Sequence, residues 1–174
     1  MYKTFFLGLM LLSPLGQSHS QEKATLCEHS ESSFQCVKYI RNYDADTLTV
    51  NVPGLHPLLG EKISIRVNGI DTPELRTKNK CEKEKAKIAK LWVERTLKKA
   101  KRIDLKNIQR GKYFRIVADV IVDGRNLTDI LLEKGMGYPY DGGTKKKVNW
   151  CLSLSELSAE FNKQFPQRNT ASQK

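Results

Sequence analysis

The sequence predicts an α+β protein, mainly β, in which five strands close into an antiparallel barrel and three helices pack on the outside. Two observations predict this fold. Three strand-like segments follow one another before a long helical segment, and two more strands and two short helices come after it. Consecutive strands of this kind, without an internal repeat, are typical of a small closed barrel covered by helices.

Five segments have the composition and alternation of β-strands. They are expected at residues 34–40, 47–52, 63–67, 102–108 and 115–122, with a turn at 42–46 and a loop at 53–60 between the first three. The third strand is the clearest, because Ile63, Ile65 and Val67 alternate with polar residues at the period of a half-buried strand. Asp123-Gly124 after the fifth strand predicts a tight turn.

Three segments are predicted to be helical, at 81–100, at 127–134 and from 153 onward. In the longest, Ala89, Trp92 and Val93 belong to an apolar stripe at three- and four-residue spacing, and lysines cover the opposite face. Gly135 is expected to close the second helix. Ser153, with a glutamate three residues later, has the pattern of a capping box that opens the third.

The first 20 residues have the layout of a secretory signal peptide. Lys3 precedes an apolar run at 5–12, and Ser18 and Ser20 place small residues at the −3 and −1 positions of a cleavage site. The apolar run is too short to span a bilayer, although an uncleaved membrane anchor is the alternative interpretation. We therefore expect cleavage near Ser20/Gln21 and a mature protein that is periplasmic or secreted.

The domain boundaries follow from these segments. We expect a signal peptide at 1–20, an N-terminal extension at 21–32, one barrel domain at 33–165 and a disordered polar tail at 166–174. About 150 residues remain after the leader, which is enough for one domain with its own core. No later segment has about 18 consecutive apolar residues, so no further membrane span is expected.

The cysteines predict disulfide bonds. An even set of four in an exported chain favours disulfides, and four cysteines allow three pairings among which the sequence cannot decide. The favoured pairing joins Cys27 to Cys36 and Cys81 to Cys151. A metal site is the competing interpretation, but no C-x-x-C spacing is present and only two histidines follow the leader.

The charge of the chain favours a polyanionic partner. The sequence has 30 Lys and Arg against 19 Asp and Glu, a formal net charge of +11, which falls to +10 when Lys3 leaves with the signal peptide. Nucleic acid is the first candidate partner, and an anionic membrane or glycan surface is the second. Net charge alone does not distinguish them.

The residues that could carry chemistry are carboxylates and arginines. The sequence has no Walker-type glycine loop and no G-x-S-x-G elbow, and its two histidines beyond the leader lie in the extension and in a loop. Segments 43–47, 65–74 and 112–115 supply acidic and basic groups instead. Singly, each has an ordinary interpretation, because an Asp-x-Asp turn caps backbone amides and Thr72-Pro73 is a common helix start.

Together, these segments resemble the staphylococcal nuclease (thermonuclease) family, whose pattern is a D-G-D-T turn, an R…D-T-P-E segment and a D-K-Y-G-R segment. Here they read Asp44-Ala45-Asp46-Thr47, Arg66 with Asp71-Thr72-Pro73-Glu74, and Gly111-Lys112-Tyr113-Phe114-Arg115. The resemblance extends over about 34–136, keeps the family's spacing from Arg66 to Glu74, and implies a five-stranded OB-fold barrel. Ala45 and Phe114 stand where the family has glycine.

The resemblance implies a calcium site and a catalytic carboxylate. Asp46 and Asp71 would bind Ca²⁺ through their carboxylates, and the backbone carbonyl of Thr72 would be a third ligand. Hard oxygen ligands of this kind suit calcium. Glu74 would hold or deprotonate the attacking water.

The resemblance also implies a surface for phosphate and nucleotide. Arg66 and Arg115 would grip the scissile phosphate and stabilise the charge that grows on its oxygens. Further contacts with the nucleotide would come from Lys112, Tyr113, Tyr138 and Tyr140. A divalent cation and two guanidiniums would stabilise the doubly charged transition state more than the substrate.

The function expected from this resemblance is that of an exported, Ca²⁺-dependent nuclease. It would hydrolyse phosphodiester bonds of DNA and RNA to products with 3′-phosphate ends, act as a monomer and have no stable membrane association after the signal is cleaved. A non-catalytic OB-fold module that binds nucleic acid is the main alternative. A basic protein bound to envelope polyanions is a further alternative, supported by charge alone.

Overall fold

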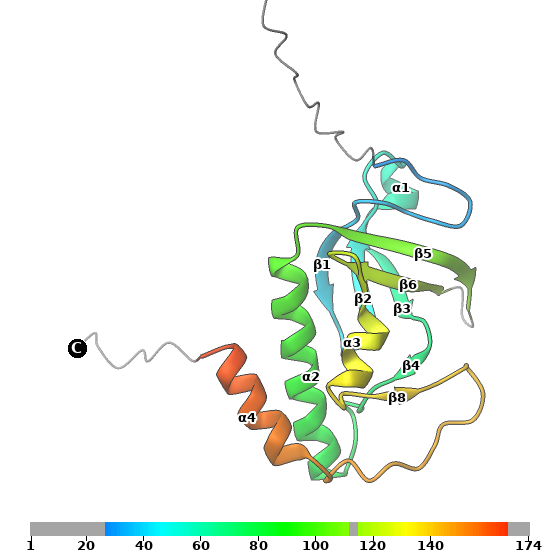
Figure 1. The fold of residues 1–174 in the computed structure, drawn as a ribbon. Helices are drawn as coiled ribbons and strands as arrows, with labels where there is room; N and C mark the ends of the chain where they lie inside the picture. The colour runs from blue at the N-terminus through cyan, green and yellow to red at the C-terminus, as the bar shows by residue number, and fades with distance from the viewer. Residues whose placement is uncertain (1–26, 112–114, 167–174) are drawn as a thin grey trace, which may run out of the picture.

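The computed structural model describes residues 27–111 and 115–166, which form a mixed β-sheet with helices packed against it (Figure 1). The strands are β1 (Lys38–Asn42), β2 (Thr47–Asn51), β3 (Ile63–Val67), β4 (Ile70–Asp71), β5 (Ile103–Arg110), β6 (Ile116–Val122), β7 (Arg125–Asn126) and β8 (Tyr138–Pro139). The main sheet runs in the order β1-β2-β3-β6-β5, with β7 paired to β6. Strands β4 and β8 form a second, small antiparallel sheet.

The predicted closed antiparallel barrel is wrong in two respects, although the α+β, OB-like character of the fold is confirmed. Strand β3 pairs with β6 in parallel, so the sheet is mixed. The strand ladder ends at β1 and β5 and does not close. The chain just before β1 contacts β5 without forming a continuous ladder. Phe34 and Leu105 form an isolated bridge, the Val37 amide donates to the Ile103 carbonyl at 2.8 Å, and the Ile108 amide donates to the Ser32 carbonyl at 3.1 Å.

The left-handed backbone of Cys36 explains this incomplete closure. Cys36 has φ of 53°, a conformation that no regular strand contains. It is bonded to Cys27, and its amide donates to the side chain of Asp104 in β5, at 2.7 Å from Oδ1, instead of to a backbone carbonyl of that strand. The strand expected at 34–40 therefore begins only at Lys38.

The described residues contain four helices, not the three predicted. They are α1 (Pro57–Gly60), α2 (Lys80–Lys99), α3 (Leu127–Glu133) and α4 (Leu154–Gln164). The extra helix is a single turn in the segment predicted as a loop, where Pro57 follows a capping His56 whose side chain accepts from the Leu58 amide. In the described residues, no helix has the length and apolar character that a membrane crossing would require.

The start of the longest helix is confirmed, whereas that of the last helix differs from the prediction. The helix expected at 81–100 is α2, which begins behind Asn79, whose side chain accepts from the Glu82 amide. Thr72-Pro73, which has the pattern of a common helix start, does not open a helix. The capping box predicted for α4 is wrong, because Ser153 has a left-handed backbone and makes no side-chain capping bond.

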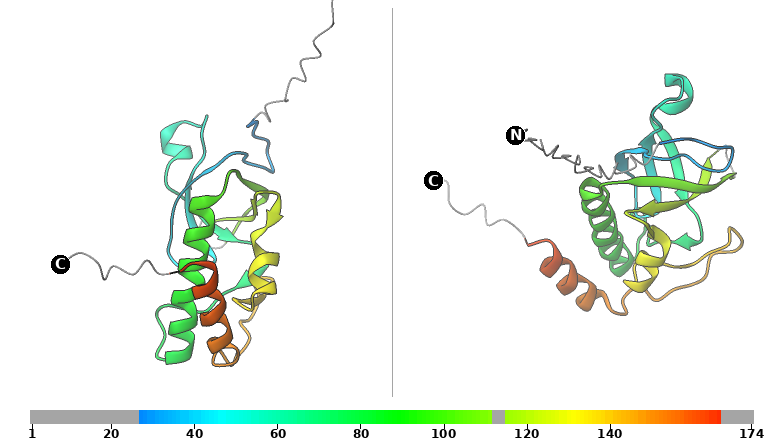
Figure 2. Two further views of the ribbon diagram at one scale, coloured as in Figure 1. Left: turned by 60° about the vertical axis from the view of Figure 1, so that its left-hand side comes forward. Right: turned by 45° about the horizontal axis from the view of Figure 1, so that its top comes forward.

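The core lies between the sheet and helix α2. As predicted, Trp92 and Val93 of α2 are buried, and Leu48, Ile65 and Leu105 of the sheet are fully enclosed. Helix α4 lies beside α2, and α3 packs against β6 (Figure 2). The apolar face of the sheet is therefore covered by helices, and the polar side chains of the strands lie on the opposite face.

Both predicted disulfides are confirmed. Cys27 bonds to Cys36 over a sequence separation of 9, and Cys81 bonds to Cys151 over a separation of 70. The second bond ties the first turn of α2 to the segment before α4. The expected signal peptide, the first part of the N-terminal extension and residues 167–174 of the tail lie outside the described residues.

Removal of the long-range disulfide is expected to cost more stability than removal of the short one. The Cys81→Ser/Cys151→Ser variant should lose about 4 kcal/mol of unfolding free energy, and Cys27→Ser/Cys36→Ser about 2.5 kcal/mol, because the longer loop restricts the unfolded chain more. Urea unfolding without reductant measures both. Equal losses in the two variants would contradict this ranking.

Candidate functional site

The three chemical segments of the sequence meet in one small cavity of about 310 Å³. It lies where the β1–β2 turn, β3, the chain after β4 and the start of β6 come together. Its lining residues are Tyr43, Asp44, Asp46, Thr47, Arg66, Asp71, Glu74, Arg115, Tyr140 and Lys145. Six of the predicted site residues therefore share a cavity, and four further residues join them: Tyr43, Asp44, Thr47 and Lys145.

The β1–β2 turn carries Asp46, a buried residue that lines the cavity. The amide of Asp46 donates to Asp44 Oδ1 at 3.2 Å, and the Asp46 carbonyl accepts from the Val67 amide at 2.8 Å. Ala45 between the two aspartates is buried and is not among the described residues with positive φ. The turn therefore does not require the glycine found in the family pattern.

Asp44 has an altered pKa that reflects the crowding of carboxyl groups. Burial and the neighbouring negative charge of Asp46 together raise the pKa of Asp44 to about 7. Protonation of Asp44 would reduce the repulsion within the turn.

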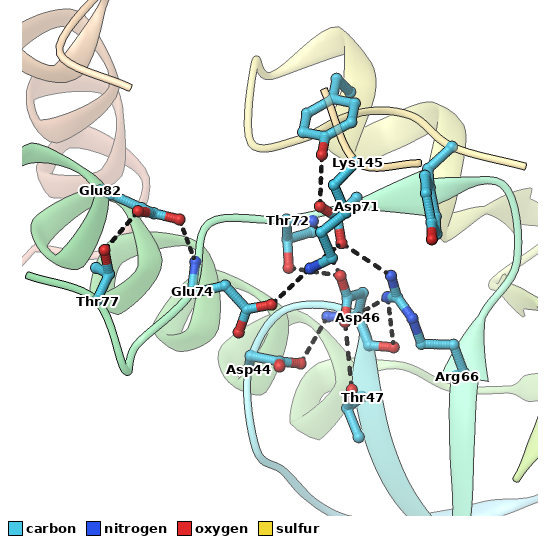
Figure 3. Close-up of polar contacts among 12 residues, drawn as sticks. Asp44, Asp46, Thr47, Arg66, Asp71, Thr72, Glu74, Thr77, Glu82 and Lys145 are labelled. Carbon is cyan, nitrogen blue, oxygen red and sulfur yellow. Dashed lines mark hydrogen bonds and ion pairs between the residues drawn. The ribbon is translucent and has the colours of Figure 1, made fainter. Parts of the chain in front are cut away.

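Asp46 is held by residues from two other segments. The amide and hydroxyl of Thr72 donate to Asp46 Oδ2 at 2.9 and 2.8 Å (Figure 3). Arg66 Nη1 forms an ion pair with Asp46 Oδ1, and Arg66 Nη2 lies 3.1 Å from Asp71 Oδ1. One guanidinium thus bridges the two carboxylates that were predicted to bind calcium.

Lys145 is a site residue that sequence reasoning missed. Its Nζ lies 3.0 Å from Asp71 Oδ1 and 2.7 Å from Glu74 Oε1, so it bridges a buried and an exposed carboxylate (Figure 3). Burial lowers the pKa of Lys145, but its bonds to Glu74 and Asp71 outweigh this and raise the pKa above its usual value. The only sequence signal was a run of three lysines, which does not single out one of them.

Tyr138, which was predicted to contact the nucleotide, contacts a carboxylate of the site. Register in the small sheet pairs Tyr138 with Asp71, and the Tyr138 hydroxyl donates to Asp71 Oδ2 at 2.6 Å. Burial and this bond raise the pKa of Tyr138 to about 12. The ring lies 5.8 Å from that of Trp150. Tyr138 therefore orients a carboxylate, whereas Tyr140 lines the cavity itself.

Glu74 is fixed through its backbone and remains accessible through its side chain. Its amide donates to Glu82 Oε1 at 3.2 Å, and Glu82 Oε2 accepts from the Thr77 hydroxyl at 2.7 Å. The first turn of α2 thus anchors the chain that carries Glu74. Arg115, the residue before β6, also lines the cavity. Lys112 and Tyr113 lie outside the described residues.

The donor set suits a hard cation, although the carboxylates are engaged by basic side chains. Asp46, Asp71 and Glu74 offer the carboxylate oxygens that calcium prefers. Over residues 27–111 and 115–166, no three acidic, histidine or cysteine side chains are arranged as a ready metal-ligand group. In this structure, the positive charge beside the carboxylates comes from Arg66 and Lys145.

Comparison with known proteins agrees with this geometry. The family model described as staphylococcal nuclease homologue matches residues 64–164, more than half of the chain. No curated protein matches the sequence. The match begins in β3, so the place of Asp46 in the site rests on the fold, which pairs β2 with β3. On the extent of this match, the chain belongs to the family of staphylococcal nuclease homologues.

Proposed function

We propose that this protein is an exported Ca²⁺-dependent nuclease that hydrolyses phosphodiester bonds of DNA and RNA to products with 3′-phosphate ends. Its family acts on nucleic acids and is generally Ca²⁺-dependent. One observation carries the proposal: three carboxylates and two arginines from separate segments line a single cavity. They are Asp46, Arg66, Asp71, Glu74 and Arg115.

Asp46 and Asp71 are proposed to hold the cation, together with the Thr72 carbonyl. Both side chains are buried, and the Thr72 amide and hydroxyl already orient Asp46. Calcium bound there would supply positive charge against the charge that develops on the phosphate. The Tyr138 hydroxyl orients Asp71 by donating to its Oδ2, whereas Arg66 and Lys145 contact its Oδ1.

Glu74 is proposed to hold the attacking water and accept its proton. Three acidic side chains of the cavity form ion pairs, and that of Glu74 is the most accessible of them. Its relative side-chain exposure is 46%, against 6% for Asp46 and 5% for Asp71. A water can therefore reach its carboxylate. Attack at phosphorus would break the bond to the 5′ oxygen and leave a 3′-phosphate.

Arg66 and Arg115 are proposed to bind the oxygens of the scissile phosphate. Arg66 is already fixed by two carboxylates, so its fork is oriented before substrate arrives. Arg115 approaches from the β6 side of the same cavity. Lys112, Tyr113 and Tyr140 are proposed to contact the nucleotide.

The proposal also includes location and assembly. We propose that residues 1–20 are a cleaved signal peptide and that the mature protein, with a nuclease domain at 33–165, acts as a monomer outside the cytoplasm. The two disulfides are compatible with an extracellular protein.

A non-catalytic nucleic-acid-binding module is the second candidate function. The ion pairs of Arg66 and Lys145 favour it, because they neutralise the carboxylates without a metal. Such a module would bind nucleic acid equally well with calcium and with a chelator. The nuclease would cleave only with calcium.

The direct test is cleavage of single-stranded DNA and RNA by the purified mature protein in a Ca²⁺ titration, with product ends identified. Cleavage should cease with chelator. Arg115→Ala should lower kcat by about 10²–10³-fold, by analogy with loss of one oxyanion donor, and Glu74→Ser should abolish activity. Arg125→Ala is the matched control, since Arg125 pairs with Glu133 outside the site. Metal-independent binding without cleavage would refute the nuclease.

Lys145 gives a second test, which does not depend on activity. Because its ammonium lies between two carboxylates of the cavity, calcium must compete with it. Lys145→Met should therefore tighten calcium binding severalfold, as removal of a nearby positive charge favours a cation. Isothermal titration with CaCl₂ measures the change in Kd. Lys147→Met, in the same loop and exposed, should have little effect. Unchanged or weaker binding by Lys145→Met would exclude the competition.

A further inference from the structure

A larger groove of about 750 Å³ adjoins the candidate catalytic cavity. It is formed by β1, β2 and β3 together with one side of α2. Tyr43 and Thr47 line both the groove and the cavity, so the two spaces meet at the β1–β2 turn. Nothing in the proposed hydrolysis uses the rest of this groove.

Strand register shows that the groove continues the sheet face that carries Arg66. Thr47 pairs with Arg66, and Thr49 pairs with Ser64, the next outward-facing position on each strand. The residues between them, Leu48 and Ile65, are buried in the core. A chain bound at Arg66 can therefore follow the same face to the next outward pair without crossing the sheet.

The groove carries an excess of positive charge. Arg41 of β1, which pairs with Thr49, Lys62 before β3 and Lys90 of α2 line it. Its acidic residue, Glu94, has a partner in Lys98 of the next helical turn. Ser64 and Thr49 add hydroxyl donors between the cations. This combination fits a phosphate backbone.

Tyr43 offers a stacking surface at the junction. Its side chain is exposed, and the guanidinium of Arg76 lies 5.6 Å from the centre of its ring. Stacking on an aromatic face requires a base whose own face is accessible, as in an unpaired strand. Ile40 adds an exposed apolar surface in the same groove.

From this continuity of face, charge and stacking surface, we propose that the groove over β1–β3 binds a single-stranded polynucleotide segment that flanks the scissile phosphate. The inference rests on the proposed function. It assigns to the protein an extended substrate site, so that long single strands bind more tightly than dinucleotides.

The test compares oligothymidylates of two and twelve nucleotides, labelled with fluorescein, by fluorescence anisotropy in EDTA. The variant Arg41→Gln/Lys62→Gln/Lys90→Gln should weaken binding of the 12-mer at least tenfold and leave binding of the dinucleotide unchanged. For this variant, the slope of log K against log salt concentration should be less steep than that of the wild type by about 2. Each lost phosphate contact on a single strand contributes about 0.7 to this slope. The control Lys83→Gln/Lys106→Gln/Lys163→Gln removes the same charge from exposed positions outside the groove.

The outcomes separate this inference from the proposed function. Undiminished 12-mer binding by the groove variant, or an equal loss in the control variant, overturns the groove. Loss of 12-mer binding confined to the groove variant supports it. If the wild type shows this binding but cleaves neither oligonucleotide with calcium, the groove stands and the nuclease proposal fails.

Discussion

Repulsion among carboxyl groups is the constraint on which the site depends. Asp44, Asp46, Asp71 and Glu74 line one cavity, and the first three are buried. Like charges in low dielectric repel strongly, so the fold must neutralise them. It does so in three ways: burial and Asp46 hold the pKa of Asp44 near 7, Arg66 bridges two carboxylates, and Lys145 reaches in from a distant loop.

The scaffold can be understood as the means of bringing these groups together. Pairing of β2 with β3 sets Asp46 beside Arg66, and pairing of β4 with β8 sets Tyr138 against Asp71. The Cys81–Cys151 bond closes the loop that carries Lys145, and Glu82 in the same helical turn holds the amide of Glu74. Elements far apart in sequence thus meet around one charge cluster, and loss of any of them exposes an unbalanced carboxylate.

Much of the fold and of the site could be predicted from the sequence. The features that could not be predicted depend on backbone conformation and on contacts between distant residues. Alternation located β3 correctly, and the apolar stripe located α2, because both signals reflect burial of one face. The failure of the strand ladder to close could not be foreseen, since it depends on the left-handed backbone of Cys36, which the side-chain pattern does not reveal. Lys145 could not be foreseen either, because its contacts span 71 residues and its loop has no periodicity.

The balance of charge in the cavity has a consequence for the coupling between two ligands. The net charge of +11 and the cations of the groove attract a polyanion, whereas the carboxylates of the cavity are paired with Arg66 and Lys145. A divalent cation in the cavity would add positive charge beside the phosphate, and a phosphate beside the cation would in turn strengthen cation binding. Linkage requires the two effects to be equal, so cation and nucleic acid should each raise the affinity for the other by the same factor. A polyanion held only by the groove would leave the cation affinity unchanged. The change in cation affinity on addition of nucleic acid therefore distinguishes a strand bound only in the groove from one whose phosphate lies in the cavity.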